Sequence, residues 1–266
     1  MRRIAKNRGK YLFGFLVLCV ILGLSSRRIF LVHRQQSLAF PEEGTVTAVY
    51  DGDTIQIRFA NGQVRKARLI GIDSPELETE REDVKFLALM AKRFTFFHLY
   101  RKKIRLTYDW QLEDKYGRVL VYVWTEDHGL FNKFILNEGF ASVFLNFPFK
   151  YRDDFIAAQQ EARRLKRGFW KEGNYPLLSV EETRDSIGKI STVEYRCIRV
   201  RKSSHFIFLD SAEEFSVLIP YENASSFPEV NSFSGQVLSV TGFLEDFRKK
   251  PQMVAFLPSQ IKLRKK

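Results

Sequence analysis

The sequence predicts a mainly β protein with added helices, organised as two small β-barrel units behind an N-terminal apolar segment. Short runs of alternating apolar and polar residues, typical of half-buried strands, recur from residue 44 onward. Turn dipeptides, Asp51-Gly52 and Asn61-Gly62, separate the first of these runs. A polar stretch at 181–185 then divides the β-rich part of the 266-residue chain, and a chain of this length accommodates two domains.

Residues 1–40 are expected to form a signal anchor or transmembrane segment followed by a linker. Basic residues precede an uncharged apolar run at 11–26, which is just short of the ~20 residues that usually span a bilayer. The basic excess before the run predicts a cytoplasmic N-terminus and an exported remainder. The run leads directly into Arg27 and Arg28 without a clear cleavage site, so a retained anchor is favoured over a cleaved signal peptide. The expected localisation is membrane-anchored with the rest outside the cytoplasm, or secreted if the signal is cleaved.

Residues 41–176 are expected to form the first unit. Alternation predicts five strands, at 44–50, 54–59, 64–72, 103–108 and 118–124. Apolar residues at mostly helical spacing predict three helices, at 77–100, 130–137 and 153–167. The first three strands form a meander, and the last two would close a small barrel.

Residues 185–264 predict a second β-rich unit. Short strand-like runs follow at barrel-like intervals, at 187–193, 195–201, 205–209, 215–219, 235–242 and 251–254. The strand pattern, with its Val240-Thr-Gly and Lys250-Pro-Gln turns, resembles an oligonucleotide-binding (OB) fold. The alternative is a generic small barrel that packs on the first unit or contacts a protein. Basic and aromatic residues that would contact a nucleic-acid strand are Tyr195, Arg196, Arg199, Arg201, Lys202, Phe206 and Phe208.

The charge of the chain favours an anionic partner. There are 43 basic and 31 acidic residues, a net charge of +12, which suits nucleic acid or an acidic membrane surface and does not choose between them. Cys19 and Cys197 are the only cysteines, and Cys19 lies in the apolar run, so no intrachain disulfide framework is expected. The four histidines lack ligand spacing, which argues against structural zinc and predicts ordinary surface or loop positions.

Three segments carry the chemistry of the first unit. They are Asp51-Gly-Asp-Thr-Ile55, Arg68-Leu-Ile-Gly-Ile-Asp-Ser-Pro-Glu76 and Asp114-Lys-Tyr-Gly-Arg118. Together they place carboxylates and two arginines near neighbouring strand ends, as metal-assisted attack on a phosphodiester requires. In this order and spacing they resemble the staphylococcal nuclease (thermonuclease) family over roughly residues 45–170. The resemblance implies that family's five-stranded OB-type barrel with three helices.

The resemblance also implies a calcium site. Asp53 and Asp73 would be its carboxylate ligands, and Ser74 would contribute its backbone carbonyl. An all-oxygen site without histidine suits calcium better than zinc. For Asp51 we favour a structural role, in which its side chain accepts hydrogen bonds from the backbone of the turn.

The resemblance implies that Arg68, Glu76 and Arg118 are catalytic. The two arginines would grip the phosphate with planar, charge-assisted hydrogen bonds, which a lysine cannot reproduce. Glu76 matches the glutamate that orients or deprotonates the attacking water, and the sequence does not distinguish these roles.

Further residues are expected to contact substrate. Lys115 and Tyr116, beside Arg118, would hold a terminal phosphate or nucleotide. Where well-known family members carry tyrosines, this chain has phenylalanines, and Phe147 or Phe149 would stack on a base without donating a hydroxyl group.

The favoured function is a calcium-dependent endonuclease that hydrolyses DNA and RNA, with single strands preferred. It is expected to act as a monomer without a small-molecule cofactor. One alternative is a non-catalytic nucleic-acid-binding or scaffolding protein of the same fold. Another makes the basic charge a membrane-surface device, which would leave the nuclease motif unexplained.

Overall fold

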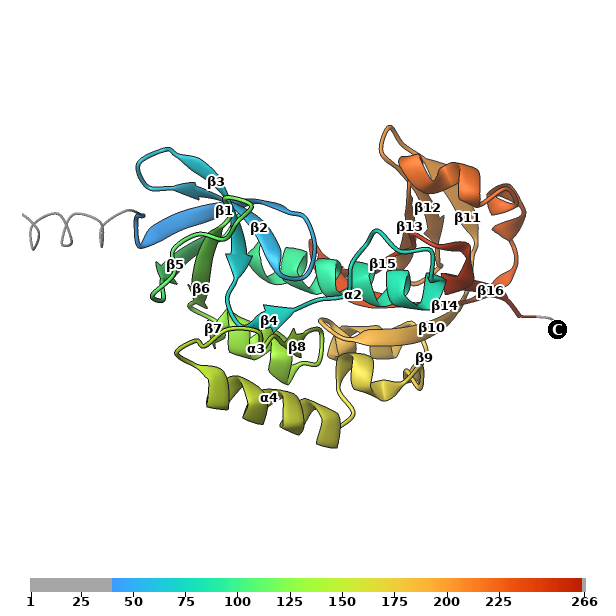
Figure 1. Ribbon diagram of the computed structural model, residues 1–266. Helices are drawn as coiled ribbons and strands as arrows, with labels where there is room; N and C mark the ends of the chain where they lie inside the picture. Colours follow the sequence, from blue (N-terminus) through green and yellow to red (C-terminus); the bar gives the residue numbers. More distant parts are fainter. Residues whose placement is uncertain (1–39, 265–266) are drawn as a thin grey trace, which may run out of the picture. The chain divides into compact units, whose positions relative to one another are not determined.

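The computed structural model describes residues 40–264, and residues from Glu43 onward form one compact unit (Figure 1). The predicted membrane or signal segment and nearly all of its linker lie outside the described residues. Within residues 40–264, no helix is long and apolar enough to span a bilayer.

Five strands close the first barrel. They are β1 (Glu43–Val49), β2 (Thr54–Phe59), β3 (Val64–Leu69), β5 (Lys103–Thr107) and β6 (Val119–Thr125). The first three are antiparallel neighbours, β1 also pairs with β5, and β5 pairs with β6. The parallel pairing of β3 with β6 joins the two ends of the sheet, so the predicted five-stranded barrel is confirmed. A short β7 (Gly129–Leu130) extends β6 at its outer edge.

The strand predicted over 64–72 is interrupted. β3 ends at Leu69, and β4 (Ile72–Asp73) pairs instead with β8 (Ser142–Val143). Gly71 causes the break because its φ of +75° suits glycine, and the ring of Phe149 occupies the space where a Cβ would lie. This turn sends Asp73 away from the barrel wall.

Three helices accompany the first barrel, as predicted. They are α2 (Glu82–Leu99), α3 (Phe131–Asn137) and α4 (Arg152–Arg164), and a 3-10 turn, η1 (Gly168–Lys171), follows. The helix α2 begins five residues later than predicted, because 77–81 is polar after its first residue and offers no apolar face to bury. Figure 1 shows α3 and α4 together below the barrel, whereas α2 runs between the barrel and the C-terminal strands.

The second sheet has its own closed strand order. Its main strands are β10 (Ile190–Arg196), β11 (Arg199–Lys202), β12 (Phe206–Asp210), β13 (Ser216–Pro220), β14 (Val237–Phe247) and β15 (Lys250–Val254). β10 continues into β11 after two residues; β10 pairs with β14, and β11 pairs with β12. β13 pairs with β12 and, in parallel, with β15, which pairs with β14. These pairings repeat the order of the first barrel, including one parallel contact between its third and fifth strands.

Smaller elements complete the second sheet. They are β9 (Leu177–Leu178), η2 (Glu181–Ser186), η3 (Tyr221–Ser226), η4 (Val230–Phe233), η5 (Pro258–Gln260) and β16 (Ile261–Leu263). The 3-10 turns and β16 were not predicted, because turns this short carry no period in the sequence. Apolar side chains of all the main strands meet in a separate core, which includes Val193, Leu209, Val217, Val240 and Met253.

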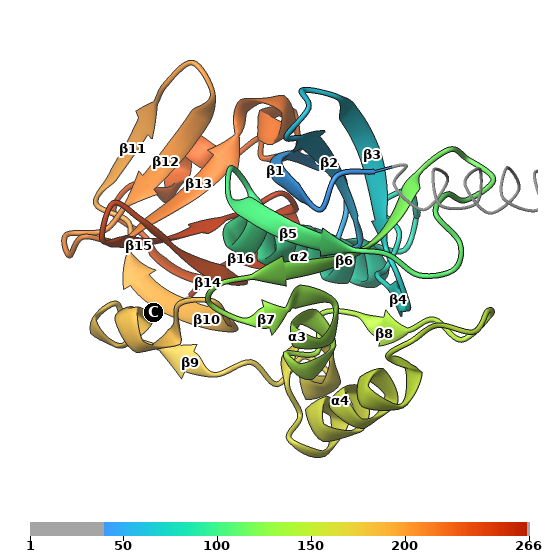
Figure 2. The ribbon, with the colours of Figure 1, turned by 90° about the vertical axis from the view of Figure 1, so that its left-hand side faces the viewer.

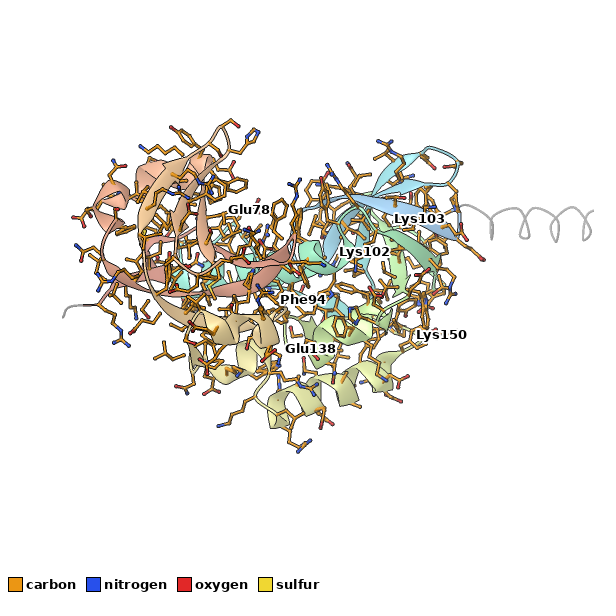
Figure 3. All side chains as sticks on the ribbon, turned by 180° about the vertical axis from the view of Figure 1, so that it is seen from behind. Glu78, Phe94, Lys102, Lys103, Glu138 and Lys150 are labelled. Atoms are coloured by element: carbon orange, nitrogen blue, oxygen red, sulfur yellow. The ribbon has the colours of Figure 1, made fainter. Side chains whose placement is uncertain are left out.

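The helix α2 packs on both sheets. On one side the Thr95 hydroxyl donates to the Gly52 carbonyl oxygen at 2.7 Å. On the other side Phe94 and Phe97 meet Phe243 of β14, with ring centroids 6.0 and 5.8 Å apart. Figure 3 shows Phe94 in the interior of the molecule.

His98 corrects the expectation of surface or loop histidines. It is buried in the same aromatic cluster, and this burial lowers its pKa to about 3.

A buried ion pair also joins α2 to the second sheet. The Arg93 guanidinium binds Glu245 of β14, and the Gln252 amide donates to the same carboxylate at 2.9 Å. The Glu245 side chain is only 5% exposed. Charges this deeply buried need their partner, because an isolated buried charge loses its hydration without compensation.

Glu245→Ala should therefore lower the free energy of unfolding by roughly 3 kcal/mol, the scale for breaking a buried pair. Glu194→Ala is the matched control, since Glu194 forms an exposed pair with Arg264 and should cost less than about 1 kcal/mol. Urea unfolding of the two variants measures the difference. Equal losses would show that the Arg93–Glu245 pair does not stabilise the junction.

Candidate active site

The turn between β1 and β2 places the first carboxylate. Asp51 Oδ1 accepts hydrogen bonds from the backbone N–H groups of Asp53 and Thr54 at 2.9 and 2.6 Å. This geometry agrees with the turn-shaping role predicted for Asp51. Gly52 lies so close to α2 and β4 that a Cβ there would come within 2.7 Å of the Cβ atoms of Ala91 and Ser74. The turn is therefore fixed on three sides, and Asp53 points inward.

Asp53, Arg68 and Asp73 come together, as predicted. The Arg68 guanidinium binds Asp53 Oδ1, and its Nη2 lies 2.7 Å from Asp73 Oδ1 and 3.2 Å from the Ile72 carbonyl oxygen. The backbone N–H of Ser74 donates to Asp53 Oδ2 at 2.6 Å. Arg68 thus lies between the two predicted ligand carboxylates, and Ser74 lies beside them.

Asp53 is the buried member of the group and Asp73 the accessible one. The side chain of Asp53 is 1% exposed, against 46% for Asp73. Burial raises the pKa of Asp53 to about 7, against the opposing charge of Arg68. Proton occupancy of this carboxylate therefore changes near neutral pH.

Arg118 joins the same network through Thr54. Its Nε donates to Asp114 Oδ2 at 2.7 Å, and its Nη1 lies 3.5 Å from the Thr54 hydroxyl oxygen. That hydroxyl donates to Asp53 Oδ1 at 3.1 Å. Asp114 also accepts the backbone N–H groups of Tyr116 and Arg118, which fixes the turn before β6. The two predicted arginines therefore converge on one carboxylate from β3 and from the start of β6.

A cavity of about 310 Å³ opens beside these residues. It is lined by Tyr50, Asp51, Thr54, Lys66, Glu76, Leu77, Glu78 and Arg118. Glu76 is exposed on the loop after β4 and contributes to the wall, opposite in charge to Arg118. The cavity thus brings the third predicted catalytic residue to the same place.

Two residues of this wall were missed by the sequence analysis. The Lys66 ammonium lies 4.1 Å from the centre of the Tyr50 ring, and the Tyr50 hydroxyl accepts a hydrogen bond from Gln56 at 3.1 Å. Alternation along β3 places Lys66 on the same face as Arg68, which is the signal that would have identified it. The sequence gave no such signal for Tyr50, which depends on the bend of the turn.

The predicted substrate-contacting residues differ in accessibility. Tyr116 is 72% exposed, and its ring lies 5.0 Å from Lys115 Nζ and 5.4 Å from Arg118 Cζ. Phe147 is half-buried beside Phe144, at 5.6 Å between ring centres. Phe149 is buried against Gly71 and is unsuited to the base-stacking role suggested for it.

The donor set fits a hard divalent cation. Two carboxylates from Asp53 and Asp73 and a backbone carbonyl from Ser74 are all oxygen donors. Elsewhere in residues 40–264, as here, no three His, Cys, Asp or Glu side chains gather around one point. A cation held here would therefore keep coordination positions for water and for substrate oxygens.

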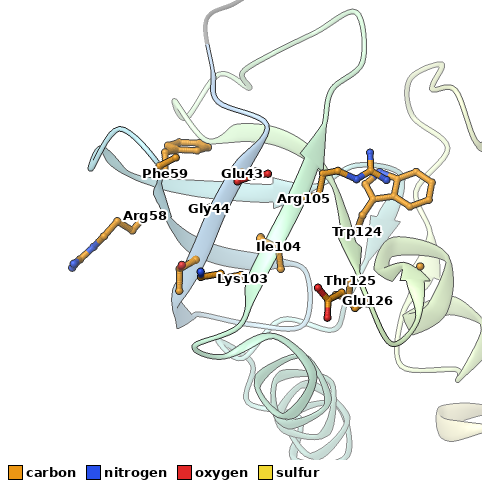
Figure 4. Close-up of a pocket in the computed structure, with 13 residues that line it drawn as sticks. Glu43, Gly44, Arg58, Phe59, Lys103, Ile104, Arg105, Trp124, Thr125 and Glu126 are labelled. Carbon is orange, nitrogen blue, oxygen red and sulfur yellow. The ribbon is translucent and has the colours of Figure 1, made fainter.

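The largest cavity of the described chain is a different one. Figure 4 shows this hollow of about 710 Å³ at β1, β2, β5 and β6, with Arg58, Lys103, Arg105 and Trp124 in its wall. None of the residues of the three nuclease-like segments lines it. Its volume therefore does not mark the catalytic centre.

Comparison with known proteins agrees with the geometry. Residues 66–172 match the family model described as "Staphylococcal nuclease homologue". A thermonuclease of Staphylococcus hyicus is 38% identical over 126 residues, 47% of this chain and 73% of that protein. A thermonuclease of Staphylococcus intermedius is 40% identical over 131 residues, 49% of this chain and 77% of the relative. An uncharacterized endonuclease of Escherichia coli is 33% identical, covering 49% and 78% respectively.

These matches lie on the first barrel and its helices, where the two arginines, the two aspartates and Glu76 are found together. Because the thermonucleases are matched over about three quarters of their length, the chain belongs to the staphylococcal nuclease family, and it is a nuclease.

Proposed function

We propose that the chain is a calcium-dependent endonuclease that hydrolyses phosphodiester bonds in both DNA and RNA and prefers single strands. One observation carries the proposal: Arg68 binds both Asp53 and Asp73, and Arg118 reaches the same network through Thr54. The cavity beside them contains Glu76. This arrangement combines cation ligands, phosphate-binding forks and an acidic group for water within one wall.

The two arginines act on the phosphate. Each guanidinium presents paired N–H donors to phosphate oxygens and stabilises the charge that grows there during in-line attack. Arg68 exchanges its carboxylate contacts for the phosphate as substrate arrives, whereas Arg118 stays anchored through Nε on Asp114. When bound, calcium supplies a Lewis acid for a phosphoryl oxygen and neutralises Asp53 and Asp73.

Glu76 acts on the water. It is exposed at the cavity wall, so its carboxylate can accept a hydrogen bond from a water molecule opposite the leaving group. Orienting the water and accepting its proton place the same demand on this residue.

The substrate preference follows from the kinds of side chain at the site. Lys66, Lys115 and Arg118 recognise phosphate, which DNA and RNA share. The faces of Tyr50, Tyr116 and Phe147 accept any unpaired base by stacking, which favours single strands. A non-catalytic binding protein would not need Asp53, Asp73 and both arginines together.

The remainder of the chain extends the proposal. The N-terminal apolar run serves as a retained anchor with the nuclease outside the cytoplasm. The second barrel is of the OB type, because its strand pairings repeat those of the nuclease barrel. The expected state is a monomer without a small-molecule cofactor.

Hydrolysis of heat-denatured DNA and of RNA should require calcium and increase toward alkaline pH. Asp53, with a pKa of about 7, is protonated below neutrality and then competes poorly for a cation. The attacking water also becomes more hydroxide-like as pH rises, and no histidine lines the cavity to act as a neutral-pH base. Initial rates with calcium and with a chelator test this across the pH range. Full activity in excess chelator would contradict the calcium assignment.

Arg68→Lys and Arg118→Lys should each lower kcat by at least ~10²-fold, the scale for losing one preorganised donor to a developing oxyanion. Arg58→Lys is the matched control, because Arg58 lies on β2 at the other cavity and should leave kcat unchanged. Steady-state kinetics with denatured DNA measure the effect, and thermal unfolding verifies the fold. Near-normal turnover in either site variant would remove that arginine from catalysis.

A further inference from the structure

We propose that the second barrel carries a separate binding surface for a single strand of nucleic acid, the strand-holding face. It comprises two sets of residues: Arg199, Arg201, Lys202, Phe206 and Phe208 of β11 and β12, and Phe247, Arg248, Lys249 and Lys250 of the β14–β15 hairpin. The proposal deepens the nuclease function above and rests on it for the polymeric nature of the substrate.

The β11–β12 hairpin presents rings and guanidinium groups on one side. Ile207 and Leu209 point into the barrel core, so alternation directs Phe206 and Phe208 outward. Arg201 pairs with Phe208 across the two strands, and its Cζ lies 3.9 Å from the centre of that ring. Neither phenylalanine is buried. Stacked guanidinium and aromatic planes of this kind bind unpaired bases without reading their sequence.

Asp210 orders the arginines without neutralising the face. Its Oδ2 lies 3.1 Å from Arg199 Nη2 and 3.2 Å from Arg201 Nε. Burial raises the pKa of Asp210, but hydrogen bonds from Arg201 and Ser216 outweigh this and leave the pKa below its usual range. One buried carboxylate therefore holds two guanidinium groups that remain 65% and 46% exposed. Preorganised forks lose less side-chain entropy when they bind phosphate.

The β14–β15 hairpin adds a second basic and aromatic element. Phe247 is 56% exposed, and Arg248 Cζ lies 5.2 Å from its ring centre. Arg248 and Lys249 occupy the left-handed region, with φ values of 55° and 67°. Glycine or asparagine would fit such a tight turn with less strain. Basic side chains are thus present at this tip despite the backbone's preference.

The two elements belong to one side of the barrel. β12 pairs with β13, and β13 pairs in parallel with β15, which begins at Lys250. Glu214, in the turn between β12 and β13, binds Lys250 Nζ at 3.1 Å. Figures 1 and 2 show β11, β12 and β13 as neighbours on the side of the second sheet away from α3 and α4. A strand crossing β12 from one hairpin to the other would meet cations and rings in turn.

This composition selects nucleic acid over other anionic partners. Anionic lipid headgroups and acidic peptides are attracted by the charges alone, whereas unpaired bases also use the exposed rings of Phe206 and Phe208. The nuclease site on the same chain acts on a polymer, so a second contact raises the local concentration of substrate. The charges of the face increase affinity for long strands and leave short substrates unaffected.

The test uses the full chain in a neutral detergent with a chelator present, so that the probe stays intact. The probe is a fluorescent single strand of about 30 nucleotides, long enough to cover several stacking and phosphate contacts. Arg201→Ser with Lys202→Ser removes two cations of the face. Lys262→Ser with Arg264→Ser is the matched control, since both are exposed at or just after β16. Point variants are preferred to deleting the barrel, which would uncover Phe94 and Phe97.

The face variant should bind at least about fivefold more weakly, and its log-affinity against log-salt slope should be shallower by about 1.4, at ~0.7 per phosphate lost on a single strand. The control should match the unmodified chain. Phe206→Leu should weaken binding without changing the salt slope, because it removes stacking and no charge. With calcium, hydrolysis of a dinucleotide should be the same in all variants.

Unchanged affinity and salt slope in the face variant would overturn the proposal, and so would loss of binding to anionic vesicles with strand binding intact. Absence of dinucleotide hydrolysis in the unmodified chain would instead contradict the nuclease function. The two failures are therefore distinguishable.

Discussion

The ion pair between Asp53 and Arg68 is the interaction on which the site depends. A carboxylate with a side chain 1% exposed must be compensated, and Arg68, Thr54 and the Ser74 backbone provide that compensation. Because these partners come from β2, β3 and the segment after β4, one buried charge fixes three segments of chain. The same contacts place Asp73 and Arg118 at its side. Charge burial and assembly of the nuclease site are thus one structural event.

The second barrel contributes to this arrangement through α2. One side of the helix supports the Asp51–Asp53 turn, through Thr95 and the close contact at Gly52. The other side receives Glu245 and Phe243 from β14. The helix is therefore packed between a catalytic turn and a separate hydrophobic core, which explains why the described residues from Glu43 onward form one compact unit. Tethering a second binding barrel also suits an enzyme whose substrate is a polymer.

The sequence predicted what depends on local pattern. Alternation and Asx-Gly turns located the strands of the first barrel, and the spacing of Asp53, Arg68, Asp73 and Arg118 placed the site residues together. The break at Gly71, the burial of His98 and the role of Thr54 as a shared partner were not predicted, because each depends on residues distant in the chain. The Arg93–Glu245 pair joins positions 152 residues apart, and no short-range pattern reveals it.

The ionisation of Asp53 tests this account most directly. A carbon-13 NMR titration of its carboxylate should give a pKa of about 7 in the presence of a chelator. Calcium should lower that pKa markedly, because a bound cation favours the ionised form. Titration in the ordinary aspartate range, near ~3.9, with no response to calcium would contradict both the burial of this carboxylate and its role as a cation ligand.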